Sequence, residues 1–301
     1  MVMNKLCQAL NSSRFLVTAE CRPPVGADAG ALLATAAKLP DVLDAIVLPD
    51  NPDRLRLSAF AAATLLRNTR DTAVIMAATT RDRNRCGLMS GALGAAAIGI
   101  SGILCVSGNH QSLGVCPQAA SANGVDTVQL VRMLKGMVLH GEEIDTEKTG
   151  KNVSLQVGAL VQPYLEPLEL NLLKVKKKVA VGADFLMTQA IFDVSGFEKW
   201  MTAVCKSGLD KRTVILPSVL ILESEGKARR LQALRTYGTI DDAVVARIAK
   251  ASDPAREGSQ LATEIAKKVK RVSGVRGIHI ICGGCEELAA GVIKQAGLAG
   301  R

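Results

Sequence analysis

Aromatic residues are scarce in this chain, where they make up only 3% of 301 positions. Proteins that bind single-stranded nucleic acid stack the bases on aromatic side chains, so the scarcity disfavours that function. The formal net charge is +9, but the basic residues are scattered apart from one lysine-rich run at 174–178. A solvated helix face or a site for a small anionic molecule therefore explains the charge better than a nucleic-acid groove.

The chain also lacks the marks of secretion and of membrane insertion. Residues 1–13 contain no uninterrupted apolar segment of the kind found in a secretory leader. The eight cysteines are dispersed, and we expect them to be reduced thiols in a cytoplasmic protein. Residues 88–106 carry no charge, but they are rich in glycine and alanine. That composition predicts a buried helix followed by a buried strand rather than a membrane span.

Short β-type runs alternate with helical stretches along the whole sequence. We expect strands at 15–20, 45–50, 73–80, 102–107, 153–161, 185–192, 213–221 and 277–281. Helices are expected at 30–38, 57–67, 84–97, 127–139, 168–181, 194–205, 226–272 with interruptions, and 286–296, and a polar segment covers 140–152. Eight such units predict an α/β fold, a single (β/α)8 TIM barrel domain over 1–301. An open doubly wound sheet is the alternative, but no strand-to-helix turn carries the G-x-G-x-x-G pattern.

Polar residues gather where the expected strands end, which is where ligands bind in α/β barrels. Thr188 and Gln189 occupy the second half of an otherwise apolar run, and Ser107 to His110 follow another. Turn and helix-cap chemistry is the alternative explanation for each of these residues. Glu20 fits that alternative least well, because it closes an apolar run at the expected barrel mouth. A carboxyl group that has lost part of its hydration there suits a general acid.

The order and spacing of these motifs resemble the methylenetetrahydrofolate reductase family over nearly the whole chain. The matching segments are Val17-Thr18-Ala19-Glu20 with Pro23-Pro24, Asp50-Asn51-Pro52, Arg81-Asp82-Arg83-Asn84, Ser107-Gly108, Lys178 with Gly182-Ala183-Asp184-Phe185 and Thr188-Gln189, and Gly277-Ile278-His279. The resemblance implies a barrel that holds a flavin, usually FAD with FMN as the alternative. It also implies reduction of 5,10-methylenetetrahydrofolate to 5-methyltetrahydrofolate, a step of one-carbon metabolism.

The resemblance further implies roles for individual residues. Glu20 matches the general acid that opens the methylene bridge, and Gln189 matches a glutamine that hydrogen-bonds folate. The positions that match flavin contacts are Thr79, Thr80, Arg81, Gly108, Asn109, Asn171, Lys178 and Ala183. Lys178 is expected at the flavin phosphate, where an ammonium group can neutralise charge. Gly108 is expected to let the backbone approach the flavin ring closely.

One feature departs from the family pattern, and a second is unusual in itself. Asn109 stands where better-known members carry an aspartate beside the flavin pyrimidine. The resemblance implies a catalytic role for this position, but here the side chain is a neutral amide. Without the negative charge, flavin reduction should be easier and hydride donation weaker. The second feature is Cys282-Gly283-Gly284-Cys285, for which no second C-x-x-C or histidine pair supports a zinc site. We interpret its cysteines as plain thiols, with contact to an electron-transfer partner as the alternative.

Three functions remain open from the sequence. The first is a methylenetetrahydrofolate reductase whose flavin takes electrons from NAD(P)H. The second is a flavoprotein subunit of a larger reductase complex, which takes electrons from a partner protein instead. The third is a barrel lyase or transferase without flavin, which would be colourless. For either flavoprotein we expect an oligomer or a subunit of a complex, with no metal, nucleic acid or membrane.

Overall fold

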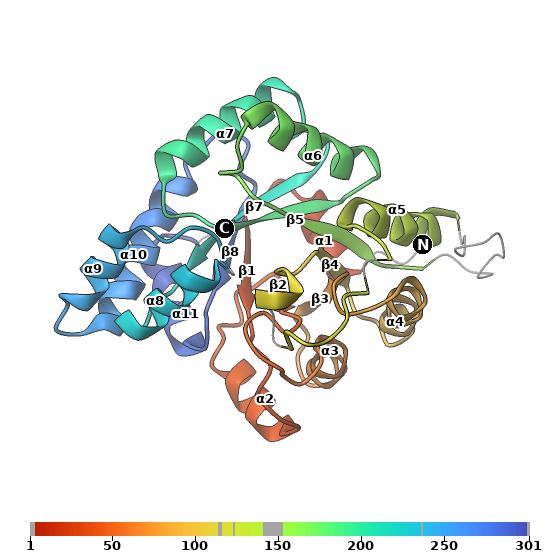
Figure 1. The fold of residues 1–301 in the computed structure, drawn as a ribbon, viewed down its shortest axis with the longest axis horizontal. Coiled ribbons are helices and arrows are strands. Elements are labelled where there is room, and N and C mark those ends of the chain that lie inside the picture. Colours follow the sequence, from red (N-terminus) through yellow and green to blue (C-terminus); the bar gives the residue numbers. More distant parts are fainter. Residues whose placement is uncertain (1–3, 114–115, 123, 141–152, 236, 300–301) are drawn as a thin grey trace.

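Eight parallel strands form a closed barrel in the computed structural model, which describes residues 4–113, 116–122, 124–140, 153–235 and 237–299 (Figure 1). Each strand pairs with its neighbours in chain order, and β8 closes the barrel against β1. The strands are β1 (Leu16–Glu20), β2 (Ala45–Leu48), β3 (Ala73–Thr79), β4 (Gly102–Val106), β5 (Gln156–Val161), β6 (Phe185–Ala190), β7 (Val214–Leu220) and β8 (Gly277–Ile281). The predicted (β/α)8 barrel is confirmed.

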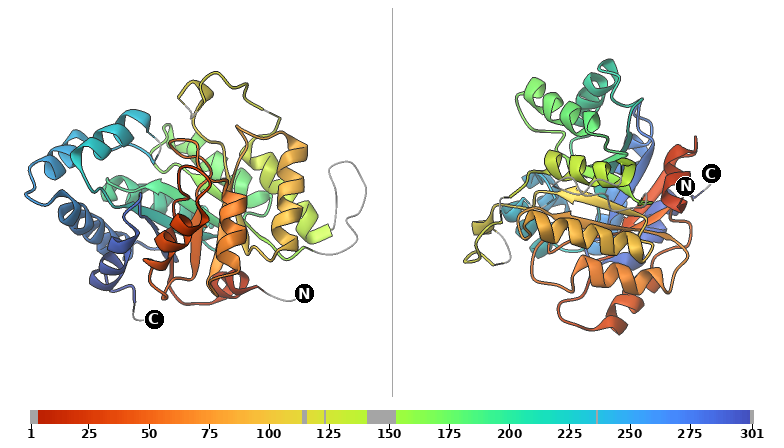
Figure 2. Two further views of the ribbon diagram at one scale, coloured as in Figure 1. Left: turned by 90° about the horizontal axis from the view of Figure 1, so that it is seen from below. Right: turned by 90° about the vertical axis from the view of Figure 1, so that its right-hand side faces the viewer.

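Helices follow the strands and surround the barrel (Figures 1 and 2). They are α1 (Lys5–Asn11), α2 (Ala29–Ala37), α3 (Ala59–Arg67), α4 (Arg85–Ala97), η1 (Gln111–Leu113), α5 (Thr127–His140), α6 (Leu168–Ala180), α7 (Val194–Lys206), α8 (Glu225–Leu234), α9 (Asp242–Ala249), α10 (Pro254–Val269) and α11 (Glu286–Gln295). The predicted region 226–272 therefore divides into α8, α9 and α10. Most of the predicted polar segment, 141–152, lies outside the described residues.

The barrel interior is filled by apolar side chains of unequal size. The Phe185 ring occupies the space beside Gly158, where an added Cβ would lie 2.2 Å from the ring. At the amino-terminal end of the strands, α1 packs Leu6 and Leu10 against the same interior cluster. We did not predict α1, because seven residues are too few to show a clear helical period. The interior is thus closed at this end, so ligands reach it from the carboxyl ends of the strands.

The uncharged segment 88–106 forms most of α4 and all of β4, as predicted. No helix in the described ranges is long and apolar enough to cross a membrane. Asn84, one of the polar residues after β3, accepts a hydrogen bond from the Gly87 amide at 2.9 Å and caps α4. Asn84 therefore has a structural role at the start of α4.

The helices α8 and α9 form an addition between β7 and α10. With the ends of β6, β7 and β8 they share an apolar cluster that includes Leu222, Leu231, Ile240 and Ile281. They lie on the opposite side of the barrel from α4 and α5 (Figures 1 and 2). Their connection brings Tyr237 to the barrel mouth.

Candidate active site

A cavity of about 150 Å³ opens at the carboxyl ends of the strands, and every strand contributes to its lining. Six of the residues predicted from the sequence line it together: Glu20, Thr79, Arg81, Gly108, Asn109 and Gln189. These residues come from four different strand ends. Their convergence follows from the closed parallel barrel, which places all carboxyl ends at one face.

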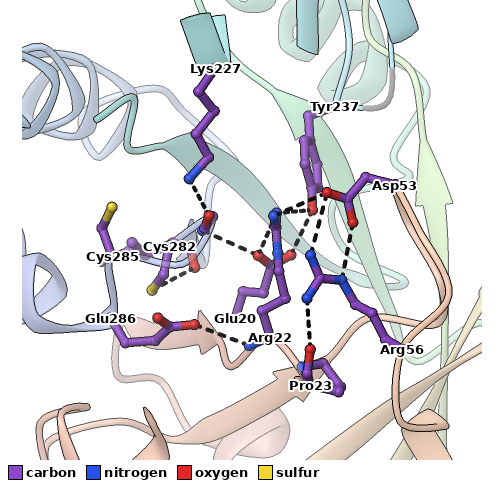
Figure 3. Close-up of polar contacts among 12 residues, drawn as sticks. Glu20, Arg22, Pro23, Asp53, Arg56, Lys227, Tyr237, Cys282, Cys285 and Glu286 are labelled. Carbon is purple, nitrogen blue, oxygen red and sulfur yellow. Dashed lines mark hydrogen bonds and ion pairs between the residues drawn. The ribbon is translucent and has the colours of Figure 1, made fainter. Parts of the chain in front are cut away.

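Glu20 ends β1 and is only 3% exposed. One carboxylate oxygen accepts hydrogen bonds from Arg22 Nη2 at 3.4 Å and from the Gly283 amide at 3.2 Å. The other accepts from the Tyr237 hydroxyl at 3.2 Å. Figure 3 shows the donors converging on this carboxylate. The side chain is therefore held in one orientation at the edge of the cavity.

Arg22 links Glu20 to the loops that follow β1, β2 and α8. Its Nη2 also donates to the Tyr237 hydroxyl at 2.6 Å, and its Nη1 lies 3.6 Å from Asp53 Oδ2. Arg56 holds Asp53 from the other side through a hydrogen bond of 3.1 Å from Nε to Oδ1. Burial alone would lower the pKa of the guanidinium, but Tyr237, Glu20 and Asp53 raise it. Arg22 is therefore a permanent cation beside the carboxylate.

The Cys282-Gly283-Gly284-Cys285 turn has a structural role that the sequence did not suggest. Gly283 and Gly284 have φ angles of 64° and 106°, a backbone region that favours glycine. This conformation aims the Gly283 amide at Glu20, while its carbonyl accepts from Lys227. Gly283, rather than either cysteine, thus donates a hydrogen bond to the predicted acid.

The thiols near this turn stay protonated and are therefore unreactive. Burial raises the pKa of Cys285 to about 12, and burial also raises the pKa of Cys21 and of Cys282 above the ordinary thiol value. Cys285 donates a hydrogen bond to Glu223, and all eight cysteines of the chain are free. Thiols that stay protonated are poor nucleophiles and poor metal ligands. In the described ranges, no three His, Cys, Asp or Glu residues group as metal ligands would.

Gln189 reaches the mouth through an irregularity in β6. The register between β6 and β7 shifts between Met187 and Ala190. Thr188 occupies the gap, and its hydroxyl accepts from the Ser218 amide at 3.0 Å. Such a shift re-aims the side chain beside it, as β-bulges next to active sites do. The Ala190 amide donates to the Tyr237 carbonyl at 2.7 Å. The connection between α8 and α9, which carries Tyr237, therefore contacts both β6 and Glu20.

His279 lies on β8 and lines the cavity beside β1. Its Nδ1 is 2.9 Å from the Thr18 hydroxyl. Burial lowers the pKa of His279 to about 3, so the imidazole is neutral near pH 7. The base of the cavity is therefore polar but uncharged at this point.

The loops after β3 and β4 form another wall. Gly108 has a φ of 73°, and an added Cβ would lie 2.8 Å from Thr79 Cγ2 and 3.3 Å from the Arg81 guanidinium. Arg81 Nη1 donates to the Asn109 carbonyl at 3.4 Å. The Asn109 side chain donates to the Leu234 carbonyl at 3.4 Å, which ties this loop to α8. The wall thus presents bare backbone at Gly108, where a flat ring could approach.

A second cavity of about 180 Å³ adjoins the first, because Ser107, Leu160 and Gln162 line both. Lys178 reaches it from α6, and its ammonium donates to the Leu160 carbonyl at 2.5 Å. Burial lowers the pKa of Lys178 to about 8. The neighbouring lysines at 174, 176 and 177 are exposed, as predicted. Lys174 also lines this cavity, but Lys178 is the less exposed of the two.

Asn171 also lines the second cavity, but its amide nitrogen is already engaged. It donates to the carbonyls of Gln162 at 2.9 Å, Pro163 at 3.1 Å and Leu165 at 3.1 Å. The side chain therefore organises the loop between β5 and α6, and its oxygen is the atom that could meet a ligand.

The other two predicted flavin contacts lie elsewhere. Thr80 directly follows β3 and is buried, and its amide donates to the Val106 carbonyl at 3.0 Å. Ala183 precedes β6, so it lies at the amino-terminal end of the barrel, opposite the mouth. Its carbonyl accepts from the Thr213 hydroxyl at 2.9 Å. Neither residue lines either cavity, and the position of Ala183 gives no support to the direct contact that the resemblance implied.

Sequence reasoning missed Arg22 and Tyr237 as members of the site. Arg22 follows Glu20 by two residues, and that proximity was the available signal. Tyr237 lies more than 200 residues away, in a connection between two helices, and nothing in the local pattern marked it.

The family comparison agrees with this geometry. The model of the methylenetetrahydrofolate reductase family matches residues 5–297. The chain belongs to this family. A comparison with curated protein sequences finds no match.

Solved structures share the fold of this family member at low sequence identity. An uncharacterized protein from Clostridium thermocellum, which binds two copies of 5-methyl-5,6,7,8-tetrahydrofolic acid, is 12% identical with a TM-score of 0.66, over 97% of this chain and 98% of that one. A Coxiella burnetii dihydropteroate synthase in complex with pteroic acid is 11% identical with a TM-score of 0.50, over 95% and 93%. A 2,3-dimethylmalate lyase is 14% identical with a TM-score of 0.51, over 100% and 90%. At these identities the likeness concerns the barrel alone.

Proposed function

We propose that this chain is a flavin-dependent methylenetetrahydrofolate reductase, which converts 5,10-methylenetetrahydrofolate to 5-methyltetrahydrofolate. The observation that carries the proposal is the convergence of Glu20 and Gln189 on one cavity in a member of this family. The bound folate of the Clostridium thermocellum protein supports a folate substrate for a barrel of this shape. The cytoplasmic location and the oligomer stay predictions from the sequence.

In the proposed reaction, Glu20 gives a proton to the bridge nitrogen of the folate. The carbon–nitrogen bond breaks, the nitrogen keeps the electron pair, and an iminium group forms on the substrate. Gln189, which lines the same cavity beside the β6 irregularity, would hydrogen-bond the pterin. General acid catalysis of this kind contributes about 10²–10⁴ in rate. The carboxylate left on Glu20 is stabilised by the same three donors that orient it.

The residues present fit a flavin. Gly108 presents only its backbone to the first cavity, and an added Cβ there would lie too close to Thr79 Cγ2, at 2.8 Å. Lys178 offers a half-buried ammonium group in the adjoining cavity, where it would bind a phosphate. Asn109 would lie along the ring edge. When bound, the flavin supplies the hydride that reduces the iminium carbon. FAD is the expected form, with FMN as the alternative.

Asn109 favours a second candidate, a flavoprotein subunit that takes electrons from a partner protein. The residue is a neutral amide whose nitrogen donates to the Leu234 carbonyl, so it adds no negative charge at the cavity. A flavin beside it would be easier to reduce, which suits a relay of electrons. The thiols of the Cys282–Cys285 turn do not add to this candidate, because they stay protonated.

An anaerobic half-reaction tests the proposal. The purified chain is loaded with FAD, reduced with light, and mixed with 5,10-methylenetetrahydrofolate while the flavin absorbance is followed. We expect the yellow colour of oxidised flavin to return, with one 5-methyltetrahydrofolate formed for each flavin. A flavin that stays reduced, although it binds tightly and reacts with other acceptors, would favour the electron-relay subunit. A chain that binds no flavin would overturn both candidates.

A further inference from the structure

One benzene-type ring lies at the cavity of the barrel mouth, in a chain whose aromatic residues make up only 3%. Of the described residues that line this cavity, only Tyr237 carries such a ring. The residue is half-buried, and its hydroxyl donates to Glu20 at 3.2 Å. This hydrogen bond accounts for the polar end of the side chain. It leaves the ring itself, an apolar surface beside a ligand cavity, without a role.

The Tyr237 ring is held from several directions. Arg22 donates to the phenol oxygen at 2.6 Å, and its guanidinium carbon lies 5.8 Å from the ring centroid. The Tyr237 carbonyl accepts from the Ala190 amide at 2.7 Å, and the side chain packs against the apolar cluster that α8 and α9 share with the strand ends. Figure 3 shows the hydroxyl end of the ring at Glu20 and Arg22. A side chain that is already ordered loses little conformational freedom when a ligand packs on it.

The next residue, Gly238, brings the same segment against Gln189. Gly238 has a φ of 110°, and an added Cβ would lie 3.2 Å from Gln189 Cβ and 3.5 Å from its Oε1. The pair Tyr237-Gly238 therefore contacts both residues that the proposed function gives to folate. It contacts Glu20 through the hydroxyl and Gln189 through bare backbone. The ring thus belongs to a segment that spans from the expected pterin contact to the expected acid.

The chemistry of the substrate indicates what this ring would meet. In 5,10-methylenetetrahydrofolate, the methylene carbon joins a pterin nitrogen to the nitrogen of the p-aminobenzoyl group. The product keeps its methyl group on the pterin nitrogen, so the bond that breaks is the one to the aminobenzoyl nitrogen. This nitrogen receives the proton from Glu20, and it is attached directly to a benzene ring. A substrate placed for proton transfer therefore brings its own aromatic ring next to the Glu20 carboxyl group.

We propose that Tyr237 binds the p-aminobenzoyl ring of the folate substrate by contact between the two rings. The inference rests on the proposed folate reduction, in which Glu20 is the acid. Offset or edge-to-face contact between aromatic rings stabilises a complex beyond the burial of apolar area. The contact fixes the aminobenzoyl nitrogen beside Glu20. It also makes the site prefer folates to pterins that lack the aminobenzoyl group.

Val25 and Leu55 offer another apolar surface at the mouth. They are 60% and 64% exposed on the loops after β1 and β2, which are joined by a hydrogen bond of 2.9 Å from the Leu57 amide to the Pro24 carbonyl. Neither side chain lines the cavity. An aminobenzoyl ring that left the cavity at once would pack here instead of on Tyr237. Leu55→Ala therefore tests the competing location.

A comparison of two ligands measures the contact without turnover. The dissociation constants of 5-methyltetrahydrofolate and of 5,6-dimethyltetrahydropterin, which lacks the aminobenzoyl group, are determined by calorimetry for the chain with and without FAD. Tyr237→Leu should weaken folate binding by about two- to tenfold and leave pterin binding unchanged. Tyr237→Phe keeps the ring and should keep the wild-type preference for folate, although it loses the hydrogen bond to Glu20.

Tyr164→Leu is the matched control, because the chain has only two tyrosines. The Tyr164 hydroxyl donates to the Asp193 carbonyl at 2.7 Å, and the residue lines neither cavity. Its preference for folate should equal that of the wild type. An equal loss of affinity for both ligands in Tyr237→Leu would show a purely structural role and overturn the inference. A preference lost in Leu55→Ala but kept in Tyr237→Leu would place the ring on the other surface.

A second readout locates the ring in the wild-type chain, whether or not Tyr237→Leu folds. With labelled tyrosine, nuclear Overhauser contacts should join the Tyr237 ring protons, identified by Tyr237→Phe, to the aminobenzoyl protons of bound 5-methyltetrahydrofolate. Bound folate without these contacts contradicts the inference and leaves the proposed function standing. If the contacts are found but folate does not oxidise the reduced flavin, the proposed reduction is wrong and the ring contact stands. A chain that binds no folate would refute both.

Discussion

The two sides of the barrel mouth are built differently. On the acid side, which we define as Glu20, Arg22, Asp53, Tyr237 and Gly283, the side chains are bonded mainly to one another. On the cofactor side, which we define as Gly108, Asn109 and Lys178, the groups contact backbone carbonyls or leave bare backbone at a cavity. The difference fits the proposed function, in which proton transfer needs one fixed carboxyl group and a large planar ligand needs space and a few anchoring charges.

The largest expected effect comes from a substitution on the acid side, and it should leave the cofactor side unchanged. Glu20→Gln keeps the shape of the side chain but removes the proton that the proposed reaction needs. Folate reduction should fall by about 10²–10⁴, while flavin binding and flavin reduction stay near wild type. Stopped-flow measurement of the two half-reactions checks this. Folate turnover within a few-fold of wild type would show that Glu20 is not the acid.

A substitution on the cofactor side should have the opposite pattern. Lys178→Ala removes the half-buried ammonium group and should weaken flavin binding by roughly 10- to 100-fold, the range for a hydrogen bond to a charged group. Lys176→Ala, an exposed lysine of the same helix, is the control and should bind flavin normally. Flavin retention after dilution and gel filtration measures the difference. Equal retention in both variants would remove Lys178 from the flavin site.

The same lysine predicts how flavin affinity depends on pH. Burial lowers the pKa of Lys178 to about 8 in the ligand-free chain, and a bound phosphate would raise it again. Binding therefore favours the protonated lysine, and affinity should be constant below pH 8 and fall above it, by up to about tenfold per pH unit. Fluorescence titration with FAD at several pH values tests this. Riboflavin, which has no phosphate, should show no such decline, and an equal decline for both ligands would contradict the assignment.

The smallest expected effect is a change of potential at Asn109. Asn109→Asp would add a carboxylate beside the flavin, and like charges about 4 Å apart repel by up to roughly 4 kcal/mol at an effective dielectric of about 20. Solvent will reduce this, so the midpoint potential should fall modestly. Asn109→Ala also loses the contact to Leu234 without adding charge, and it is the control for loop movement. A potential that is unchanged or higher in Asn109→Asp would mean that residue 109 does not face the flavin.

Much of the barrel was predictable from the sequence, because strands buried on both faces appear in it as continuous apolar segments. Glu20 and Gln189 could be predicted as well, since each is a polar residue at the carboxyl end of such a run. Arg22 was visible only as a neighbour of Glu20, and its contacts depend on loops that meet in three dimensions. Tyr237 was not predictable, because the packing of α8 and α9 on the strand ends brings it to the mouth.

Other motifs were visible, but their meaning depended on geometry. The Cys282–Cys285 turn drew attention to its thiols, whereas its glycines supply the conformation that reaches Glu20. Ala183 belongs to a segment that resembles the family, but a linear match does not tell which end of the barrel a residue occupies. Asn171 matched a ligand contact, and its amide nitrogen instead holds the loop after β5.

A crystal structure with both FAD and 5-methyltetrahydrofolate tests the division of the mouth most directly. The account predicts that the flavin ring lies beside Gly108 and Asn109, with its phosphate at Lys178. The pterin should lie between the flavin and Gln189, with Glu20 in reach of the nitrogen that it protonates. Two folate molecules, one of them in the space beside Gly108 and Lys178, would contradict the assignment of a cofactor side. So would a flavin bound against Glu20.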